Sequence, residues 1–171
     1  MEPTPASDAN LYTALRAAFP SERSLTAIET DQGLRYTWDD LDRGVAMMAN
    51  LLASLEIPPG ARIAAQVDKS VEALLLYLAT LRAGFVYLPL NTAYQQAELD
   101  YFIGNAEPAV VVCAGRSFPW LSTLAFQKGV RHVFTLNDDR TGTWLDRAAA
   151  FPDMHTPVPR RADELAAILY T

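Results

Sequence analysis

Short apolar runs alternate with segments of helical periodicity through the middle of this 171-residue chain. The runs lie at residues 62–67, 85–88, 109–113 and 130–136. The segments between them place apolar side chains at helical spacing and lie at residues 71–83, 99–106 and 120–127. Strand, helix and strand in succession are typical of parallel sheets, whose strands are buried on both faces. We therefore predict an α/β fold with a mostly parallel sheet flanked by helices.

The part of the chain before the first run has a different pattern. Apolar residues at helical spacing predict a short amphipathic helix near residues 11–19, which Pro20 ends. Two strand-like pieces at residues 25–29 and 34–37 follow it. They are separated by a turn that contains Gly33, a residue suited to positive φ. The sequence therefore predicts an N-terminal antiparallel hairpin.

Capping residues mark the start of two further helices. Thr37 followed by Asp40 approximates a capping box, and the helix that it opens is predicted to run to about Leu55. Thr143 is predicted to cap a short helix that runs through Ala150.

The last twenty residues are predicted to be a connector followed by the start of a strand. Residues 151–161 contain three prolines and read as an extended connector. Residues 165–171 are apolar almost to the last residue, with no turn signal, and are predicted to begin a new buried strand. Since domains seldom end inside a buried strand, we expect residues 1–171 to be a fragment, the first part of a larger N-terminal domain.

Composition restricts the class of partner. The net charge is −6 and the basic residues are scattered singly, which disfavours binding to nucleic acid or to an anionic membrane. One cysteine cannot form an internal disulfide, and no secretion signal opens the chain. The longest apolar stretch, residues 73–79, is much shorter than the roughly 18 residues of a membrane span. A cytoplasmic protein that binds small molecules is predicted.

No residue in the chain forms a familiar catalytic motif by itself. Glycine-rich phosphate loops are absent, and the two histidines lie in no cluster with metal-ligand spacing. We expect His132 to be partly buried and His155 to be solvated. Cys113 ends an apolar run and is expected to be a buried hydrophobe. The residues therefore predict an α/β domain and no catalytic or metal site.

Three segments in order resemble the early core motifs of adenylate-forming enzymes, the group that contains acyl-CoA synthetases. They are residues 34–41, 81–91 and 165–171. The third segment resembles the strand that enters the phosphate-binding loop of that family. The resemblance implies that Thr171 is the first residue of this loop and contacts ATP.

Within the family, four segments are similar to malonyl-CoA synthetases, at residues 68–74, 77–80, 89–94 and 98–103. That similarity implies ligation of malonate to coenzyme A through a malonyl-adenylate, with release of AMP and pyrophosphate. ATP, magnesium and coenzyme A are the implied cofactors, and most of their sites would follow Thr171. The resemblance therefore implies that this chain alone is inactive.

Two alternatives remain open from the sequence. The acid could be another small one, such as methylmalonate, acetate or an aromatic acid, because the residues that choose it would follow Thr171. The chain could instead be a complete, non-catalytic α/β module that binds a partner or a small ligand. The sequence does not fix the oligomeric state.

Overall fold

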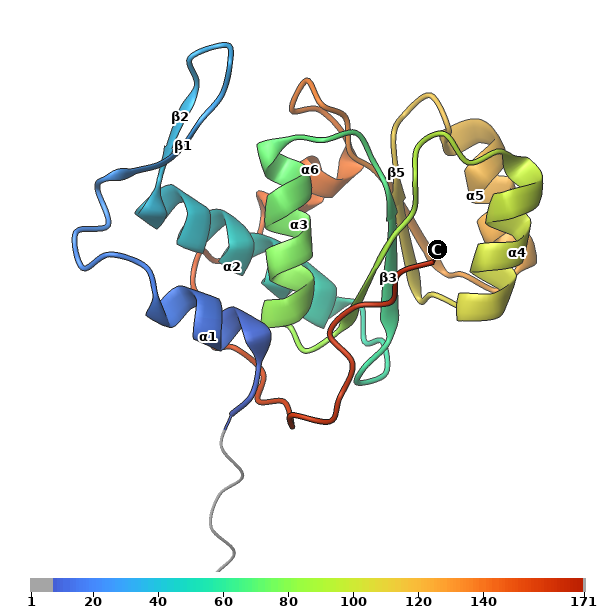
Figure 1. Ribbon diagram of the computed structural model, residues 1–171. Helices are drawn as coiled ribbons and strands as arrows, with labels where there is room; N and C mark the ends of the chain where they lie inside the picture. The colour runs from blue at the N-terminus through green and yellow to red at the C-terminus, as the bar shows by residue number, and fades with distance from the viewer. Residues whose placement is uncertain (1–7, 171) are drawn as a thin grey trace, which may run out of the picture.

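A four-stranded parallel sheet forms the centre of the molecule in a computed structural model that describes residues 8–170 (Figure 1). Its strands stand in the order β4-β3-β5-β6. Their bounds are β3 (Arg62–Gln66), β4 (Val86–Pro89), β5 (Val110–Cys113) and β6 (His132–Thr135). Each strand coincides with one of the four apolar runs. The predicted α/β fold with a parallel sheet is confirmed.

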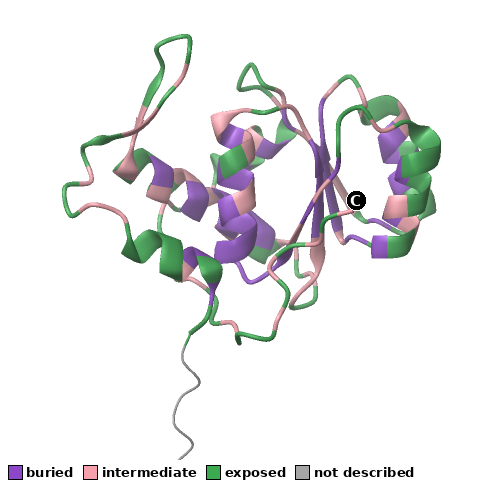
Figure 2. Ribbon diagram, in the orientation of Figure 1, coloured by how far each residue is buried: buried purple, intermediate pink, exposed green. Residues whose placement is uncertain are grey.

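Helices cover both faces of this sheet (Figure 1). On one face lie α2 (Trp38–Ser54), α3 (Val71–Arg82) and α6 (Thr143–Ala148), with α1 (Leu11–Ala17) packed against α3. The other face carries α4 (Gln96–Ala106) and α5 (Phe118–Gln127). The buried residues form a continuous layer on each side of the strands (Figure 2). This three-layer arrangement leaves the ends of the strands as the places where side chains from several loops converge.

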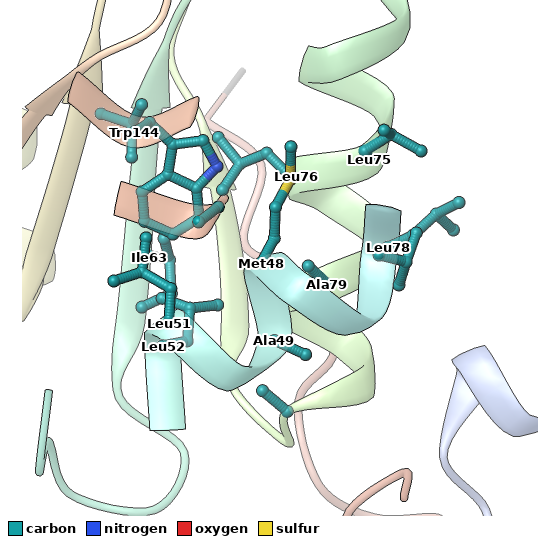
Figure 3. Packing of buried hydrophobic residues seen from close by; sticks show 14 of the residues in the cluster. Met48, Ala49, Leu51, Leu52, Ile63, Leu75, Leu76, Leu78, Ala79 and Trp144 are labelled. Atoms are coloured by element: carbon teal, nitrogen blue, oxygen red, sulfur yellow. The ribbon is translucent and has the colours of Figure 1, made fainter. Parts of the chain in front are cut away.

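The larger core cluster lies between the sheet and helices α2 and α3. Figure 3 shows Leu51 and Leu52 of α2 next to Ile63 of β3, and Met48 of α2 next to Leu76 of α3. Four of these side chains are at most 1% exposed, and Met48 is 3% exposed. Truncating one such leucine to alanine typically costs about 2–5 kcal/mol. The apolar residues whose spacing predicted α2 and α3 are therefore also the residues that pack these helices against the sheet.

The predicted hairpin is present as β1 (Thr26–Glu29) and β2 (Arg35–Thr37), an antiparallel pair. Gly33 has a φ of +80°, which the turn requires and glycine adopts without strain. Immediately after β2, the Thr37 side chain accepts a hydrogen bond from Asp40 N at 3.1 Å, and Asp40 accepts one from Thr37 N at 2.9 Å. The capping box that opens α2 is confirmed.

The predicted cap at Thr143 is wrong. The residue that caps α6 is Gly142, which has a φ of +132°, and a Cβ atom there would collide with the backbone of Thr135. Thr143 is instead the first residue of the helix, and its Oγ1 accepts a hydrogen bond from Thr135 N at 2.9 Å. A close approach between helix and strand selects glycine as the cap, and the threonine joins α6 to β6.

The end of the chain is extended, as predicted, but residues 165–170 do not form a strand of their own. Residues 151–161, all of which the structure describes, contain no helix or strand. Beyond them, Ala167 makes a single parallel bridge to Tyr87 of β4. The next ladder position on that side of β4 is Pro89, which has no N–H to donate. The ladder therefore stops after the hydrogen bonds of Tyr87, and the run is half-exposed where burial was predicted.

Candidate functional site

The carboxyl ends of the parallel strands form one edge of the sheet. From β3 the chain passes to β4 on one side, and then crosses to β5 on the other side of β3. Loops that follow β3 and β5 therefore diverge at this edge. In open α/β sheets, such a point of divergence is where ligands bind. We take this edge as the candidate functional site.

An ion pair joins the two diverging loops. Asp68 follows β3, and Arg116 follows β5. Arg116 Nη2 donates to Asp68 Oδ1 at 2.8 Å and Nη1 donates to the other carboxylate oxygen, so the pair is bidentate. The hydrogen bonds from Arg116 lower the pKa of Asp68. Because the Arg116 side chain is 62% exposed, the pair aligns the loops while contributing little to stability.

Two amide side chains fix the backbone of the neighbouring loops. Gln66, the last residue of β3, is 2% exposed, and its Nε2 donates to the carbonyls of Asn91 and Tyr94 at 3.2 and 3.5 Å. Its Oε1 is buried without a hydrogen-bond partner in the described part of the chain. Asn137 Oδ1 accepts a hydrogen bond from Gly115 N at 2.7 Å. Sequence reasoning assigned no role to either amide, although a polar residue that ends an apolar run is a usable signal.

The last described residues run toward the same edge. Ala167 lies beside Tyr87 in a parallel bridge, so the chain approaches the carboxyl ends of the strands as it reaches Tyr170. The Tyr170 hydroxyl donates to Asn105 Oδ1 at 2.6 Å, and its ring lies 4.4 Å from that of Phe102. Thr171, the one site residue that the resemblance implied, lies outside the described residues. Its contact with ATP stays a prediction.

A groove of about 750 Å³ lies beside this edge, between the hairpin, α2, α6 and the start of α3. Glu72, whose side chain is 8% exposed, accepts hydrogen bonds there from the Tyr36 hydroxyl at 2.7 Å and from Arg140 Nε at 3.1 Å. Arg140 also lies over the Tyr36 ring, 5.8 Å from its centroid. These contacts fasten the hairpin to α3.

Another ion pair, in which both side chains are largely buried, lies at the other end of α3. The Arg82 side chain is 6% exposed, and its Nη1 lies 2.9 Å from Asp42 Oδ1 and 3.1 Å from the Tyr12 hydroxyl. Sequence reasoning missed both Arg82 and Glu72. The available signal is that they are the only charged residues of an otherwise largely apolar helix, where a buried charge requires a partner.

The predicted states of three single residues can be compared with the structure. His132 is partly buried, as predicted. Cys113 is buried, as predicted, and burial raises the pKa of its thiol to about 12, so no thiolate forms near neutral pH. The prediction that His155 is solvated is wrong. Its Nδ1 is buried, and burial followed by the charge of Arg82 lowers the pKa of its imidazole.

Residues 8–170 bring together no group of three or more histidine, cysteine or carboxylate side chains that could hold a metal ion. In the same range, no helix combines the length and apolar character that a membrane crossing requires.

Known proteins similar to this chain share its fold and much of its sequence. The structures of MatB from Rhodopseudomonas palustris, without ligand and bound to ATP, are 44% identical to it, with TM-scores of 0.91 and 0.90. Each comparison covers 96% of this chain and 32% of MatB. The medium-chain fatty-acid–CoA ligase of Escherichia coli K12 is 30% identical over 156 residues, which cover 85% of this chain and 27% of the ligase.

The chain therefore spans about a third of the length of these relatives or less. The predicted resemblance to the N-terminal part of malonyl-CoA synthetases is confirmed by the MatB structures. The model of one family, described as AMP-binding enzyme, matches residues 15–171. Because this match includes every strand and all but the first turn of α1, the chain belongs to the family of AMP-binding enzymes.

Proposed function

We propose that residues 1–171 form the first part of the large N-terminal domain of an ATP-dependent acid–CoA ligase whose acid is malonate. The observation that carries this proposal is the 44% identity to MatB over 96% of the chain, at a TM-score of 0.91. The ATP-bound MatB structure supports ATP as a substrate.

The proposed reaction has two steps, formation of an acyl-adenylate and transfer of the acyl group to coenzyme A. A malonate carboxylate oxygen attacks the α-phosphorus of ATP, and pyrophosphate leaves, giving malonyl-adenylate. The thiol of coenzyme A, having lost its proton, then attacks the acyl carbon, and AMP leaves. The first step converts a poor leaving group into a good one, so that stabilising charge on the phosphates is the main catalytic demand.

The described residues supply the framework for this chemistry. The bidentate Asp68–Arg116 pair and the Gln66 and Asn137 amides fix four loops at the carboxyl edge. Residues 165–170 lead the chain to that edge, where we place Thr171 at the start of the ATP loop. Magnesium has no fitting set of side chains within residues 8–170, so no step on this chain is assigned to it. We place the magnesium and coenzyme A sites in the remainder of the protein, and the protein in the cytoplasm.

The test is an assay of AMP release by the full-length protein, supplied with ATP, coenzyme A and one acid at a time. Malonate should give the highest kcat/KM, above methylmalonate, acetate, benzoate and octanoate. The 171-residue chain, run alongside, should release no AMP. A preference for octanoate would replace malonate with the acid class of the E. coli relative, and no AMP release with any acid would contradict the ligase assignment itself.

A further inference from the structure

Residues 151–161, which we call the strap, are fixed along the outside of the helical layer. Asn50 Nδ2 of α2 donates to the carbonyls of Pro152 and Met154 at 2.8 and 2.9 Å. The Asn10 side chain donates to the carbonyl of Val158 at 2.7 Å. The strap runs below α1 and α3 in Figure 1, between the end of α6 and the segment that approaches β4. A segment that the sequence predicts as a simple connector is therefore bound to α2 and to Asn10, the residue that caps α1.

Arg82 makes the most contacts with the strap. Its Nε donates to the carbonyl of His155 at 2.9 Å, and its Nη2 donates to the same oxygen. Its backbone carbonyl accepts a hydrogen bond from Val158 N at 2.8 Å. The remaining nitrogen, Nη1, is held by Asp42 and Tyr12. The guanidinium is thereby oriented by two helices and presents its other face to the strap.

Few contacts define the register of the segment that follows the strap, and of its side chains only Tyr170 forms a hydrogen bond outside the segment, to Asn105 in α4. Residues 165–170 are held on β4 by two backbone hydrogen bonds, from Tyr87 N to Ala166 O and from Ile168 N to Tyr87 O, both 2.9 Å long. Pro89 prevents the ladder from continuing. A slip by two residues would keep the same side chains facing the sheet and would move the chain by about 6.6 Å. The register therefore depends on where the strap places the start of the segment, in addition to the contacts of Tyr170 with Asn105 and Phe102 at its end.

We propose that Arg82 is a positioning residue: by holding the strap at His155, it sets the register of residues 165–170 on β4. It thereby sets where the chain after Tyr170 enters the carboxyl edge of the sheet. This inference rests on the proposed function, because ATP binding is the property that a displaced entry would change. Arg82 itself lies at the amino end of β4 and makes no contact with the carboxyl edge.

The test compares Arg82→Lys with Arg140→Lys. Both variants replace an arginine that binds a carboxylate at one end of α3, but only Arg82 contacts the strap. In the full-length protein, Arg82→Lys should raise the Kd for ATP about tenfold, which corresponds to about 1.4 kcal/mol. Arg140→Lys should leave the Kd for ATP within about twofold. Equal ATP affinity in Arg82→Lys and the wild type, measured well below both unfolding temperatures, would overturn the inference.

A second measurement separates this inference from the proposed function. Hydrogen exchange at the Ile168 amide reports the bridge to Tyr87 whether or not the protein is a ligase. In Arg82→Lys we expect this amide to exchange at least about ten times faster than in the wild type, while the amide of Val111 in β5 accelerates by a smaller factor, which reports the loss of global stability alone. If the wild type releases no AMP with any acid but Ile168 responds in this way, the ligase assignment fails and the role of Arg82 in setting the register stands. An unchanged Ile168 amide contradicts that role.

Asn50→Asp provides the same test in a variant that keeps the core intact. The Asn50 side chain lies at the surface, and the change removes the two hydrogen bonds to Pro152 and Met154 without altering side-chain size. Its effects on Ile168 exchange and on ATP affinity should have the same direction as those of Arg82→Lys, and should be smaller. If Arg82→Lys does not fold, the response of Asn50→Asp decides whether the strap sets the register: an unchanged Ile168 amide would overturn the inference, and a faster one would support it.

Discussion

The two ends of α3 carry ion pairs of the same chemistry in opposite settings. At the carboxyl-terminal end the arginine is buried: the side chain of Arg82 is 6% exposed and that of Asp42 is 17% exposed. At the amino-terminal end the carboxylate is buried: Glu72 is 8% exposed, whereas Arg140 is 54% exposed. Water therefore has little access to either partner of the first pair. In the second pair, water can reach Glu72 from the side on which Arg140 lies.

This difference explains what each pair holds. Arg82 is bound to Tyr12 of α1, to Asp42 of α2 and to the strap, so its contacts join α3 to two other helices and to the strap. Arg140 is bound to Glu72 and lies over Tyr36, so its contacts fasten only the hairpin and the adjoining loop. Two ion pairs on one helix thus differ in the number of elements that depend on them. The following predictions test whether burial of the arginine accounts for that difference.

The largest effect is expected for Arg82→Met. The substitution removes the guanidinium and leaves Asp42 and the carbonyl of His155 without this donor in a largely buried place. Removing one partner of a buried ion pair typically costs about 3–5 kcal/mol, and because Asp42 keeps Arg16 as a partner, we expect the low end, about 3 kcal/mol. The free energy of unfolding, measured with urea on the 171-residue chain, should fall by about that amount. A loss below about 1 kcal/mol would show that water replaces the guanidinium as easily here as at Arg140.

The second effect concerns Asp42 and acid. Burial alone would raise the pKa of its carboxyl group, but hydrogen bonds from Arg16 and Tyr12 and the charge of Arg82 outweigh burial and lower the pKa to about 2. Since the folded pKa lies below the unfolded value of 3.8, the ionised group stabilises the fold above about pH 4, and this stabilisation is lost as the pH falls toward 2. The loss should be about 2 kcal/mol.

The measurement is the free energy of unfolding of the chain between pH 5 and pH 2, with Asp42→Asn as the matched variant. Asp42→Asn should be less stable at pH 5 and should lose less stability on acidification. If both proteins lose the same amount between those pH values, the acid sensitivity of the fold comes from other carboxylates.

A smaller effect is expected at the other end of α3. Arg140→Ala leaves Glu72 bonded to the Tyr36 hydroxyl and open to water on the side of the lost arginine. Exposed ion pairs contribute about 0.2–1 kcal/mol, and the variant should lose no more than that. Comparing its urea unfolding with that of Arg82→Met tests the contrast between the two ends directly. Losses of equal size would show that burial of the arginine is not what distinguishes them.

Much of the fold could be predicted from the sequence because buried apolar residues recur at the spacing of the helix or strand that contains them. The four apolar runs gave the four strands, and the Thr37 and Asp40 pair gave the start of α2. These features depend on residues close in sequence. The cap at Gly142 was missed because it depends on the backbone of Thr135, which only the folded chain brings near.

The candidate site was less predictable for the same physical reason. Arg82 and Glu72 have partners between 36 and 73 residues away, and no local pattern identifies them. The strand predicted at residues 165–171 was reduced to one bridge by Pro89, a residue of the neighbouring strand. The role of Thr171 was predicted from the resemblance to a family. The framework of loops that leads to it was found only in the structure.

The smallest expected effect is that of His155, whose backbone carbonyl binds Arg82 and whose imidazole is partly buried beside the same guanidinium. Burial, followed by the charge of Arg82, holds the pKa of His155 below its usual 6.5. Because the unfolded chain binds this proton more readily, the neutral imidazole gives full stability above about pH 6.5, and stability falls as the pH drops below that value. Arg43, Asp153, Arg16 and Asp42 are the other charged groups around this part of the strap.

His155→Gln removes the titrating group, so the free energy of unfolding should change less with pH between about pH 6.5 and pH 5 than it does in the wild type. Thermal unfolding of this variant and of the wild type across that range makes the comparison. If His155→Gln keeps the wild-type slope, protonation of the His155 imidazole beside Arg82 does not destabilise the fold.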